Sequence, residues 1–208
     1  KFASDNKKEF FLEISEKERF KNCKKKYKKF VLIVGDSHAA NVFNSISKNS
    51  KYDFIIALIK DGCRPSIKDN CHYDNVENFI KKEIEDVKKI IFTQKGSFFL
   101  TNTGNPNNPN FTSARKLPIL EDEINTTIKY LKKINNLFPI IFIGPHIEPN
   151  VELTKNNIKS VINSGNIDIF SSNQNLDIIS VDKFLKKEMK KNNINYISKI
   201  DQLNFNFK

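Results

Sequence analysis

Residues 30–40 read FVLIVGDSHAA, a short apolar run that ends in a Gly-Asp turn and continues at once into a helical pattern. Residues 30–34 contain no polar side chain, which is typical of a strand buried on both faces in a parallel sheet. From residue 39 to residue 47, apolar residues return every three or four positions, as on one face of an amphipathic helix. The stretch therefore predicts a strand, a tight turn at Gly35 and a helix, with Ser37 at the junction.

The same alternation continues along the chain. Four further apolar runs predict strands, at residues 54–59, 90–92, 140–143 and 194–197. Helical patterns occupy residues 76–87, 117–135 and 176–191. This order predicts an α/β domain with a mostly parallel five-stranded sheet and right-handed crossovers.

The first 28 residues differ from the rest. Residues 5–20 place apolar side chains at near-helical spacing, and residues 24–29 are almost all lysine. We expect a lead-in helix and a basic connector over residues 1–28, followed by a single α/β domain over residues 29–208. No internal repeat or long linker divides that domain.

Composition narrows the classes of function. The chain of 208 residues carries a formal charge of +11, but nearly all of the excess is lysine, since Arg19, Arg64 and Arg115 are its only arginines. No basic stripe alternates with aromatic residues in a nucleic-acid-binding pattern, so we expect no nucleic-acid partner. An anionic membrane surface or an acidic glycan suits the charge better. No apolar stretch reaches the 18 to 20 residues or so that span a bilayer.

Three cysteines occur, at positions 23, 63 and 71, and none forms a Cys-x-x-Cys pair. We therefore expect no metal and no cofactor. Cys63 and Cys71 are either free thiols in a reducing cytosol or a disulfide that closes a short loop, and the spacing favours the disulfide. Such a loop would add about 2 to 3 kcal/mol of stability and imply a periplasmic or extracytoplasmic location.

The turn at Ser37 has the setting of a nucleophile. A serine hydroxyl needs a base to take its proton and donors to hold the oxyanion that forms, and the first N–H groups of a helix are free to act as such donors. The loops at residues 61–65, 101–113 and 144–149 leave the same carboxyl edge of the sheet, where open α/β sheets bind ligands. The alternative is that Asp36 or Ser37 only caps the helix.

The string VLIVGDSHAANVFNSI, residues 31–46, resembles the first block of the SGNH (GDSL-like) hydrolase superfamily. The sequence is most similar to the SGNH domains fused behind the membrane-embedded part of acyltransferase-3 proteins, which O-acetylate surface polysaccharides. In those domains the first block is GDSHA and the second loop carries Cys-x-Pro with another cysteine shortly after, as in Cys63-Arg64-Pro65 and Cys71 here. The resemblance also includes residues 90–98, extends from about residue 29 to 200, and implies a three-layer flavodoxin-like fold.

The resemblance also implies roles for individual residues. Ser37 would be the nucleophile and its own N–H one oxyanion donor, and the N–H of Gly62, after the second strand, would be another. The superfamily's third donor, an Asn in a Gly-x-Asn-Asp motif, is absent. Gln94 stands at the corresponding strand end as a candidate donor, with Lys95 and Asn102 as competitors.

The catalytic base is the main departure from the family. The superfamily supplies it from an Asp-x-x-His block after the last strand, and nothing after residues 194–197 fits. We expect the chain to stop before that block; the alternative is that the domain works without it. Of the three histidines, we expect His38 to be structural or substrate-facing and His72 to be an ordinary surface residue. His146, with Glu148 two residues on, is the candidate substitute base.

These implications give the expected function: serine-dependent O-acyl (acetyl) transfer to or from hydroxyls of a cell-surface polysaccharide. The expected partners are a fused transmembrane acyltransferase-3 domain, a glycan acceptor and an acyl donor. The expected location is periplasmic or extracytoplasmic, tethered to the inner membrane through the parent protein. The alternative is a non-catalytic module that binds a glycan or a partner. Nucleotide or phosphate binding at Gly35 lacks the glycine patterns that such loops need.

Overall fold

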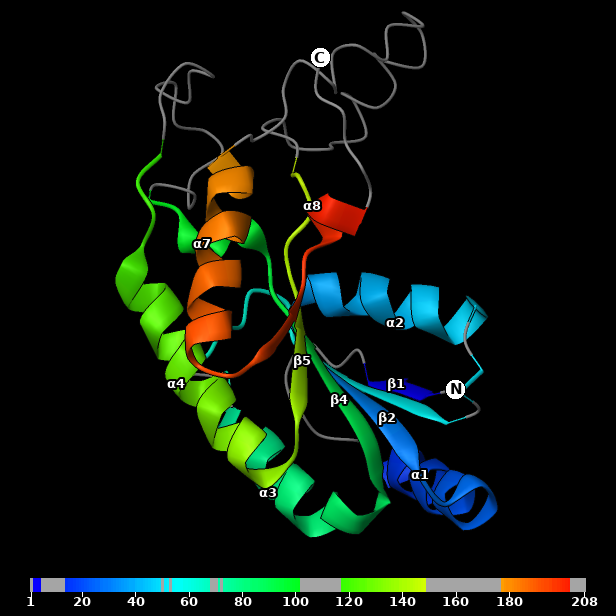
Figure 1. Ribbon diagram of the computed structural model, residues 1–208. Helices are drawn as coiled ribbons and strands as arrows, with labels where there is room; N and C mark the ends of the chain where they lie inside the picture. The colour runs from blue at the N-terminus through cyan, green and yellow to red at the C-terminus, as the bar shows by residue number, and fades with distance from the viewer. Residues whose placement is uncertain are drawn as a thin grey trace, which may run out of the picture.

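The computed structural model describes residues 2–4, 14–49, 51–52, 54–67, 71, 73–101, 117–148 and 177–202. Its centre is a six-stranded sheet in which all neighbouring strands are parallel, in the order β1-β3-β2-β4-β5-β6 (Figure 1). The strands are β1 (Phe2–Ser4), β2 (Phe30–Gly35), β3 (Ile55–Ile59), β4 (Val87–Thr93), β5 (Ile140–Ile143) and β6 (Asn195–Ile197).

Helices connect these strands. They are α1 (Ile14–Tyr27), α2 (Ser37–Asn49), α3 (Tyr73–Glu83), α4 (Glu121–Leu137), α7 (Asp177–Lys191) and α8 (Lys199–Gln202), with short 3-10 helices η1 (Ile84–Asp86) and η2 (Gly96–Phe99). The α/β class and the five predicted strands are confirmed. The sixth strand, β1, was not predicted, because three residues are too few to show a periodic pattern.

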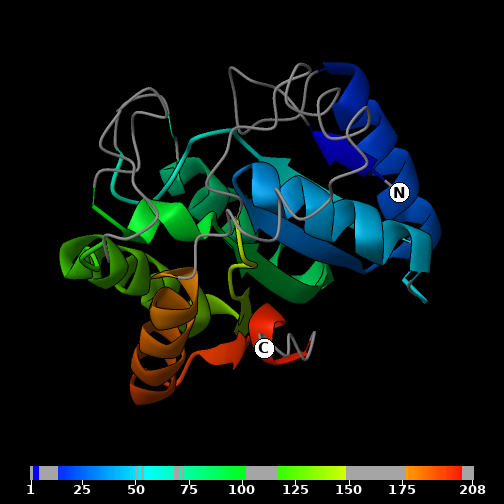
Figure 2. The ribbon, with the colours of Figure 1, turned by 90° about the horizontal axis from the view of Figure 1, so that it is seen from above.

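The sheet is buried on both faces, as its apolar runs predict. Alternate residues of β2 enter different clusters: Leu32 and Val34 pack beneath α3, α4 and α7, whereas Val31 and Ile33 pack against α2. Figure 2 shows α2 and α4 on opposite sides of the sheet. The result is a three-layer sandwich.

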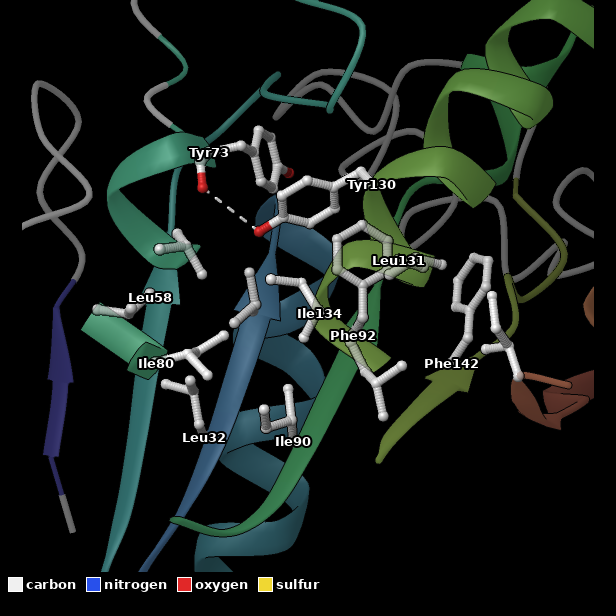
Figure 3. Close-up of a cluster of buried hydrophobic side chains, with 14 of the residues drawn as sticks. Leu32, Leu58, Tyr73, Ile80, Ile90, Phe92, Tyr130, Leu131, Ile134 and Phe142 are labelled. Atoms are coloured by element: carbon white, nitrogen blue, oxygen red, sulfur yellow. Dashed lines mark hydrogen bonds between the residues drawn. The ribbon is translucent and has the colours of Figure 1, made fainter. Parts of the chain in front are cut away.

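The larger of the two clusters is rich in aromatic side chains. Phe92 packs edge-on against Phe142, with ring centroids 5.4 Å apart, and Tyr73 packs edge-on against Tyr130 at 4.9 Å. The Tyr130 hydroxyl lies 3.5 Å from the Tyr73 carbonyl oxygen, to which it donates a hydrogen bond (Figure 3). This bond joins α4 to the start of α3 inside the core.

Helix α1 ends later than the sequence predicted, and residues 5–13 of the predicted helix lie outside the described residues. Its last turn contains Lys24, Lys25 and Lys26, which we had assigned to a connector. Lysine favours helix interiors and interacts well with the negative end of the helix dipole. The buried Phe20 ring packs on Phe30 at 5.8 Å, so α1 covers the amino end of the core.

A disulfide joins Cys63 to Cys71, with Cα atoms 5.3 Å apart. The predicted pairing is confirmed, and Cys23 is the free cysteine among the described residues. The Tyr73 hydroxyl donates to the Cys63 carbonyl oxygen at 3.2 Å, which ties the bridged loop to α3.

We expect the variant Cys63→Ser/Cys71→Ser to lose about 2.5 kcal/mol of unfolding free energy, because opening the short loop returns entropy to the unfolded chain. Urea denaturation measures the difference. Cys23→Ser is the matched control, since it removes a thiol and opens no loop. Equal stabilities of the double variant and the control would contradict the prediction.

Candidate active site

The candidate site lies where the chain leaves β2, between its two neighbours in the sheet. Gly35 is in register with Ile59 of β3 on one side and Thr93 of β4 on the other. Its φ is +152°, and a Cβ atom there would lie 1.9 Å from the Thr93 carbonyl oxygen. Only glycine fits. The next two strands along the chain, β3 and β4, lie on opposite sides of β2 in the sheet. The carboxyl end of β2 is therefore the topological switch point, where open α/β sheets bind ligands.

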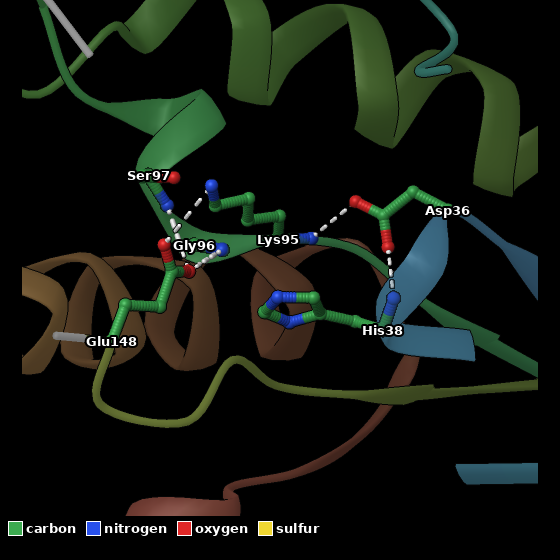
Figure 4. A network of polar contacts seen from close by, with 6 residues as sticks. All are labelled: Asp36, His38, Lys95, Gly96, Ser97 and Glu148. Carbon is green, nitrogen blue, oxygen red and sulfur yellow. Dashed lines mark hydrogen bonds and ion pairs between the residues drawn. The ribbon is translucent and has the colours of Figure 1, made fainter. Parts of the chain in front are cut away.

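Asp36 holds the turn together. Its carboxylate is fully buried and accepts two backbone hydrogen bonds, from the His38 N–H at 2.8 Å and from the Lys95 N–H at 2.7 Å (Figure 4). Burial raises the pKa of Asp36 to about 6, although both hydrogen bonds act in the opposite direction. Asp36 is therefore the cap of α2 and also its link to the segment after β4.

Ser37 is the first residue of α2 and its side chain is exposed. The next two N–H groups are occupied, since His38 donates to the Asp36 carboxylate and Ala39 donates to the Asp36 carbonyl oxygen at 2.9 Å. Within the described part of the chain, no acceptor contacts the Ser37 N–H. Because Asp36 supplies the cap, both the hydroxyl and the N–H of Ser37 remain available to a ligand.

Gly62 lies in the turn after β3, next to the Ser37 turn in the sheet. The Cys63 N–H donates to the Lys60 carbonyl oxygen at 3.2 Å, which closes the turn, and Lys60 in turn donates to the Gly35 carbonyl oxygen at 3.1 Å. Gly62 is exposed and its φ is +71°, a left-handed conformation that favours glycine. Its predicted part in an oxyanion site stays a prediction.

The candidate third donor is placed less favourably. The Gln94 side chain is fully buried, and neither its amide nitrogen nor its amide oxygen has a hydrogen-bond partner among the described residues. The Lys95 N–H, the competing group, already donates to Asp36. Asn102 lies outside the described residues, as does His72. The role of Gln94 stays a prediction.

Glu148 has a structural role that the sequence did not reveal. Its buried carboxylate accepts hydrogen bonds from the N–H groups of Gly96, at 2.7 Å, and Ser97, at 3.1 Å, and the Lys95 ammonium lies 3.9 Å away (Figure 4). Two carboxylates, Asp36 and Glu148, thus hold the backbone of residues 95–97. The sequence does predict that Glu148 and residues 95–97 lie near each other, because loops that follow neighbouring parallel strands meet at one edge of the sheet. It does not predict which N–H groups bind which carboxylate.

His146 lies beside the Ser37 turn because its ring packs on His38, the residue after Ser37. The two imidazole rings stack, with centroids 4.5 Å apart and an angle of 21° between their planes. Burial lowers the pKa of His38 to about 3, and electrostatic interactions with His146, Lys199 and Lys95 act in the same direction. Burial and the Lys199 charge also lower the pKa of His146. His146 is therefore neutral near pH 7 and able to accept a proton.

Lys199, which the sequence analysis missed, completes the charged surroundings. It is half-buried at the start of α8, and burial lowers its pKa against the influence of Asp36 and Glu148. A neighbouring hydrogen-bond network joins α7 to β6 and to the residue before α8. The buried Asp182 accepts hydrogen bonds from the Tyr196 hydroxyl at 2.5 Å and from the Ser198 hydroxyl at 2.7 Å.

The buried histidine makes stability depend on pH. The pKa of His38 is about 3 in the folded chain and about 6.5 in the unfolded chain. The unfolding free energy that depends on a neutral His38 is therefore fully present above pH 6.5 and is lost as the pH falls toward 3. We expect lowering the pH from 7 to 4.5 to cost the wild type about 2 kcal/mol more than His38→Phe, which keeps a ring but cannot titrate. Urea denaturation at the two pH values measures the loss of unfolding free energy in each protein. Equal losses in the wild type and in His38→Phe would contradict the prediction.

Metal sites and membrane-spanning helices are both absent from the described residues. Among the described residues, no group of three or more His, Cys, Asp or Glu side chains is arranged to hold a metal ion. No helix in the described ranges has the length and apolar character needed to cross a bilayer.

Comparison with known proteins relates the whole arrangement to one family. A family model described as an SGNH domain (fused to AT3 domains) matches residues 6–204. Among solved structures, the chain is similar to the periplasmic domain of a lipopolysaccharide acetyltransferase from Salmonella ser. Paratyphi A, with 22% identity and a TM-score of 0.56 over 90% of this chain and 72% of that one. A lipase/acylhydrolase from Enterococcus faecalis has 11% identity and a TM-score of 0.37 over 81% of this chain and 75% of its own. No curated protein matches.

Proposed function

Because the chain belongs to the family of SGNH domains that are fused to AT3 domains, we propose that it transfers acyl groups to or from hydroxyls of a cell-surface polysaccharide, with Ser37 as nucleophile. The observation that carries the proposal is the exposed Ser37 hydroxyl at the start of α2, with the helix cap supplied by Asp36 instead. A serine needed only as a cap would be redundant at this position.

The proposed chemistry begins with attack of the Ser37 hydroxyl oxygen on the carbonyl carbon of an acyl donor. The carbonyl oxygen becomes an oxyanion, for which the N–H groups of Ser37 and Gly62 are the proposed donors. Collapse of this intermediate breaks the bond to the leaving oxygen, which receives the proton taken from Ser37 and departs as an alcohol, and the acyl group remains on Ser37. A sugar hydroxyl then attacks the acyl-serine and receives the acyl group, or water attacks and hydrolyses it.

Two proton acceptors fit this chemistry. One is His146, which is neutral near pH 7 and stacks on the residue next to Ser37. The other is the histidine of the Asp-x-x-His block that the family places after the last strand, since no histidine follows His146 in these 208 residues. Gln94 remains the candidate third oxyanion donor, with a buried amide that has no hydrogen-bond partner among the described residues.

The proposed setting follows from the family and the disulfide. An AT3 domain of the kind to which the family is fused is the proposed membrane partner and source of acyl groups. The Cys63–Cys71 bridge is typical of proteins in an oxidising compartment. We therefore place the domain on the periplasmic side of the inner membrane, tethered through the parent protein, with a glycan as acceptor.

The test uses the full-length parent protein. We expect Ser37→Ala to abolish labelling by a fluorophosphonate probe and to lower polysaccharide acetylation in cells by at least about 1,000-fold, because the acyl-serine can no longer form. Ser180→Ala on α7 is the matched control and should label normally. Unchanged acetylation in Ser37→Ala would favour a non-catalytic binding module instead.

The same assay separates the two proton acceptors. His146→Gln removes the basic nitrogens and keeps a polar side chain of similar size. Loss of labelling comparable to that of Ser37→Ala would identify His146 as the acceptor, whereas near-normal labelling would assign that role to the segment beyond residue 208.

A further inference from the structure

The Arg64 side chain joins the two segments that flank the Ser37 turn. One segment is the loop that follows β3, and the other is η2, which follows β4; these two strands lie on either side of β2. The guanidinium carbon of Arg64 lies 4.8 Å from the centre of the Phe98 ring in η2. A cation at this distance from an aromatic ring is attracted to it. Arg64 therefore links the loop after β3 to the short helix after β4.

The same guanidinium is also bound to the first turn of α4. Its Nε–H donates to the Ser66 hydroxyl at 3.2 Å, and Nε lies 3.4 Å from a Glu123 carboxylate oxygen. The Ser66 hydroxyl donates to the second oxygen of that carboxylate at 2.7 Å. The Glu123 side chain is only 11% exposed. A network that is largely shielded from water restrains its members more than an exposed ion pair does.

The Gly62 turn lies directly before Arg64 in the same loop. At its start, the Lys60 N–H donates to the Gly35 carbonyl oxygen at 3.1 Å, which ties the turn to the end of β2. Across it, the Cys63 N–H donates to the Lys60 carbonyl oxygen at 3.2 Å. The place of Gly62 at the edge is therefore set by Gly35 on one side and by whatever holds residues 63 and 64 on the other.

The restraints on that second side act in two directions. The disulfide to Cys71 and the hydrogen bond from the Tyr73 hydroxyl hold Cys63 toward α3. Arg64 holds the next residue toward α4 and η2. Arginine suits this role because its rigid planar group binds a carboxylate and lies over an aromatic ring at the same time, whereas lysine offers a flexible point charge.

We propose that Arg64 is a positioning residue for the oxyanion site. Through its contacts with α4 and η2, it holds the Gly62 N–H in place beside Ser37. This inference rests on the proposed acyl transfer by Ser37. Since a misplacement of about 1 Å can cost on the order of 100-fold in rate, and removal of one oxyanion donor costs about 100- to 1,000-fold, a loosened Gly62 turn should slow formation of the acyl-serine.

The first test measures how fast the fluorophosphonate probe labels Ser37 in the full-length parent protein. We expect Arg64→Ala and Glu123→Gln each to lower the maximal labelling rate about 10- to 100-fold. The probe concentration that gives half of this rate should not change, because an oxyanion donor acts in the transition state. The double variant should be no slower than Arg64→Ala, since the two residues act as one unit. Lys81→Ala, which breaks the ion pair with Glu77 on α3, is the matched control and should label normally.

Arg64→Lys separates positioning from a direct charge contact with the substrate. This variant keeps the positive charge and loses the planar group, so we expect it to label nearly as slowly as Arg64→Ala. Normal labelling of Arg64→Lys, or of Glu123→Gln beside a slow Arg64→Ala, would overturn the proposal in favour of a direct contact. Labelling of Arg64→Ala at the wild-type rate would also overturn it.

Amide hydrogen exchange gives a second readout that needs no activity. Because the Cys63 N–H closes the Gly62 turn, we expect it to exchange at least about tenfold faster in Arg64→Ala, while the Leu32 amide in β2 keeps its protection. Failure of the probe to label the wild type would count against the proposed function of Ser37 itself. A labelled wild type together with unchanged exchange at Cys63 in Arg64→Ala would overturn only the role of Arg64.

Discussion

The buried carboxylate of Asp36 is the interaction on which the site depends. It accepts the N–H of His38 on its own helix and the N–H of Lys95, 59 residues further on. One side chain therefore caps α2 and fixes the segment that follows β4. The close contact of Gly35 with the Thr93 carbonyl oxygen admits no other residue at the turn. Together these constraints leave Ser37 exposed, with no hydrogen bond from its hydroxyl to the described residues.

Near this interaction the fold buries other charged and titratable groups, and their partners come from distant parts of the sequence. Glu148 accepts the N–H groups of Gly96 and Ser97 from the next loop along the edge. Burial lowers the pKa of both His38 and His146, whose rings stack, and the Lys199 charge acts in the same direction. In the described part of the carboxyl edge, these polar groups lie above an apolar core.

Local patterns predicted the parts of the structure that local forces determine. The apolar runs predicted five strands. The Gly-Asp turn and the family resemblance pointed to Ser37, and the cysteine spacing and the same resemblance predicted the Cys63–Cys71 bridge. The strand at residues 2–4 was missed because three residues carry no period. The helix cap at Asp36 was an alternative that the sequence offered, whereas its bond to Lys95 and the role of Glu148 were missed because these partners lie 51 to 59 residues away in the sequence. Only the packing of neighbouring strand ends decides which N–H group meets which acid.

Amide hydrogen exchange tests most directly whether Asp36, and not Ser37, holds the turn. In Asp36→Ala, we expect the amides of Lys95 and His38 to exchange at least about tenfold faster, since each loses a hydrogen bond to a buried carboxylate, while the Leu32 amide in β2 keeps its protection. In Ser37→Ala, all three amides should exchange as in the wild type. Unchanged exchange at Lys95 in Asp36→Ala, or faster exchange at Lys95 in Ser37→Ala, would contradict the account.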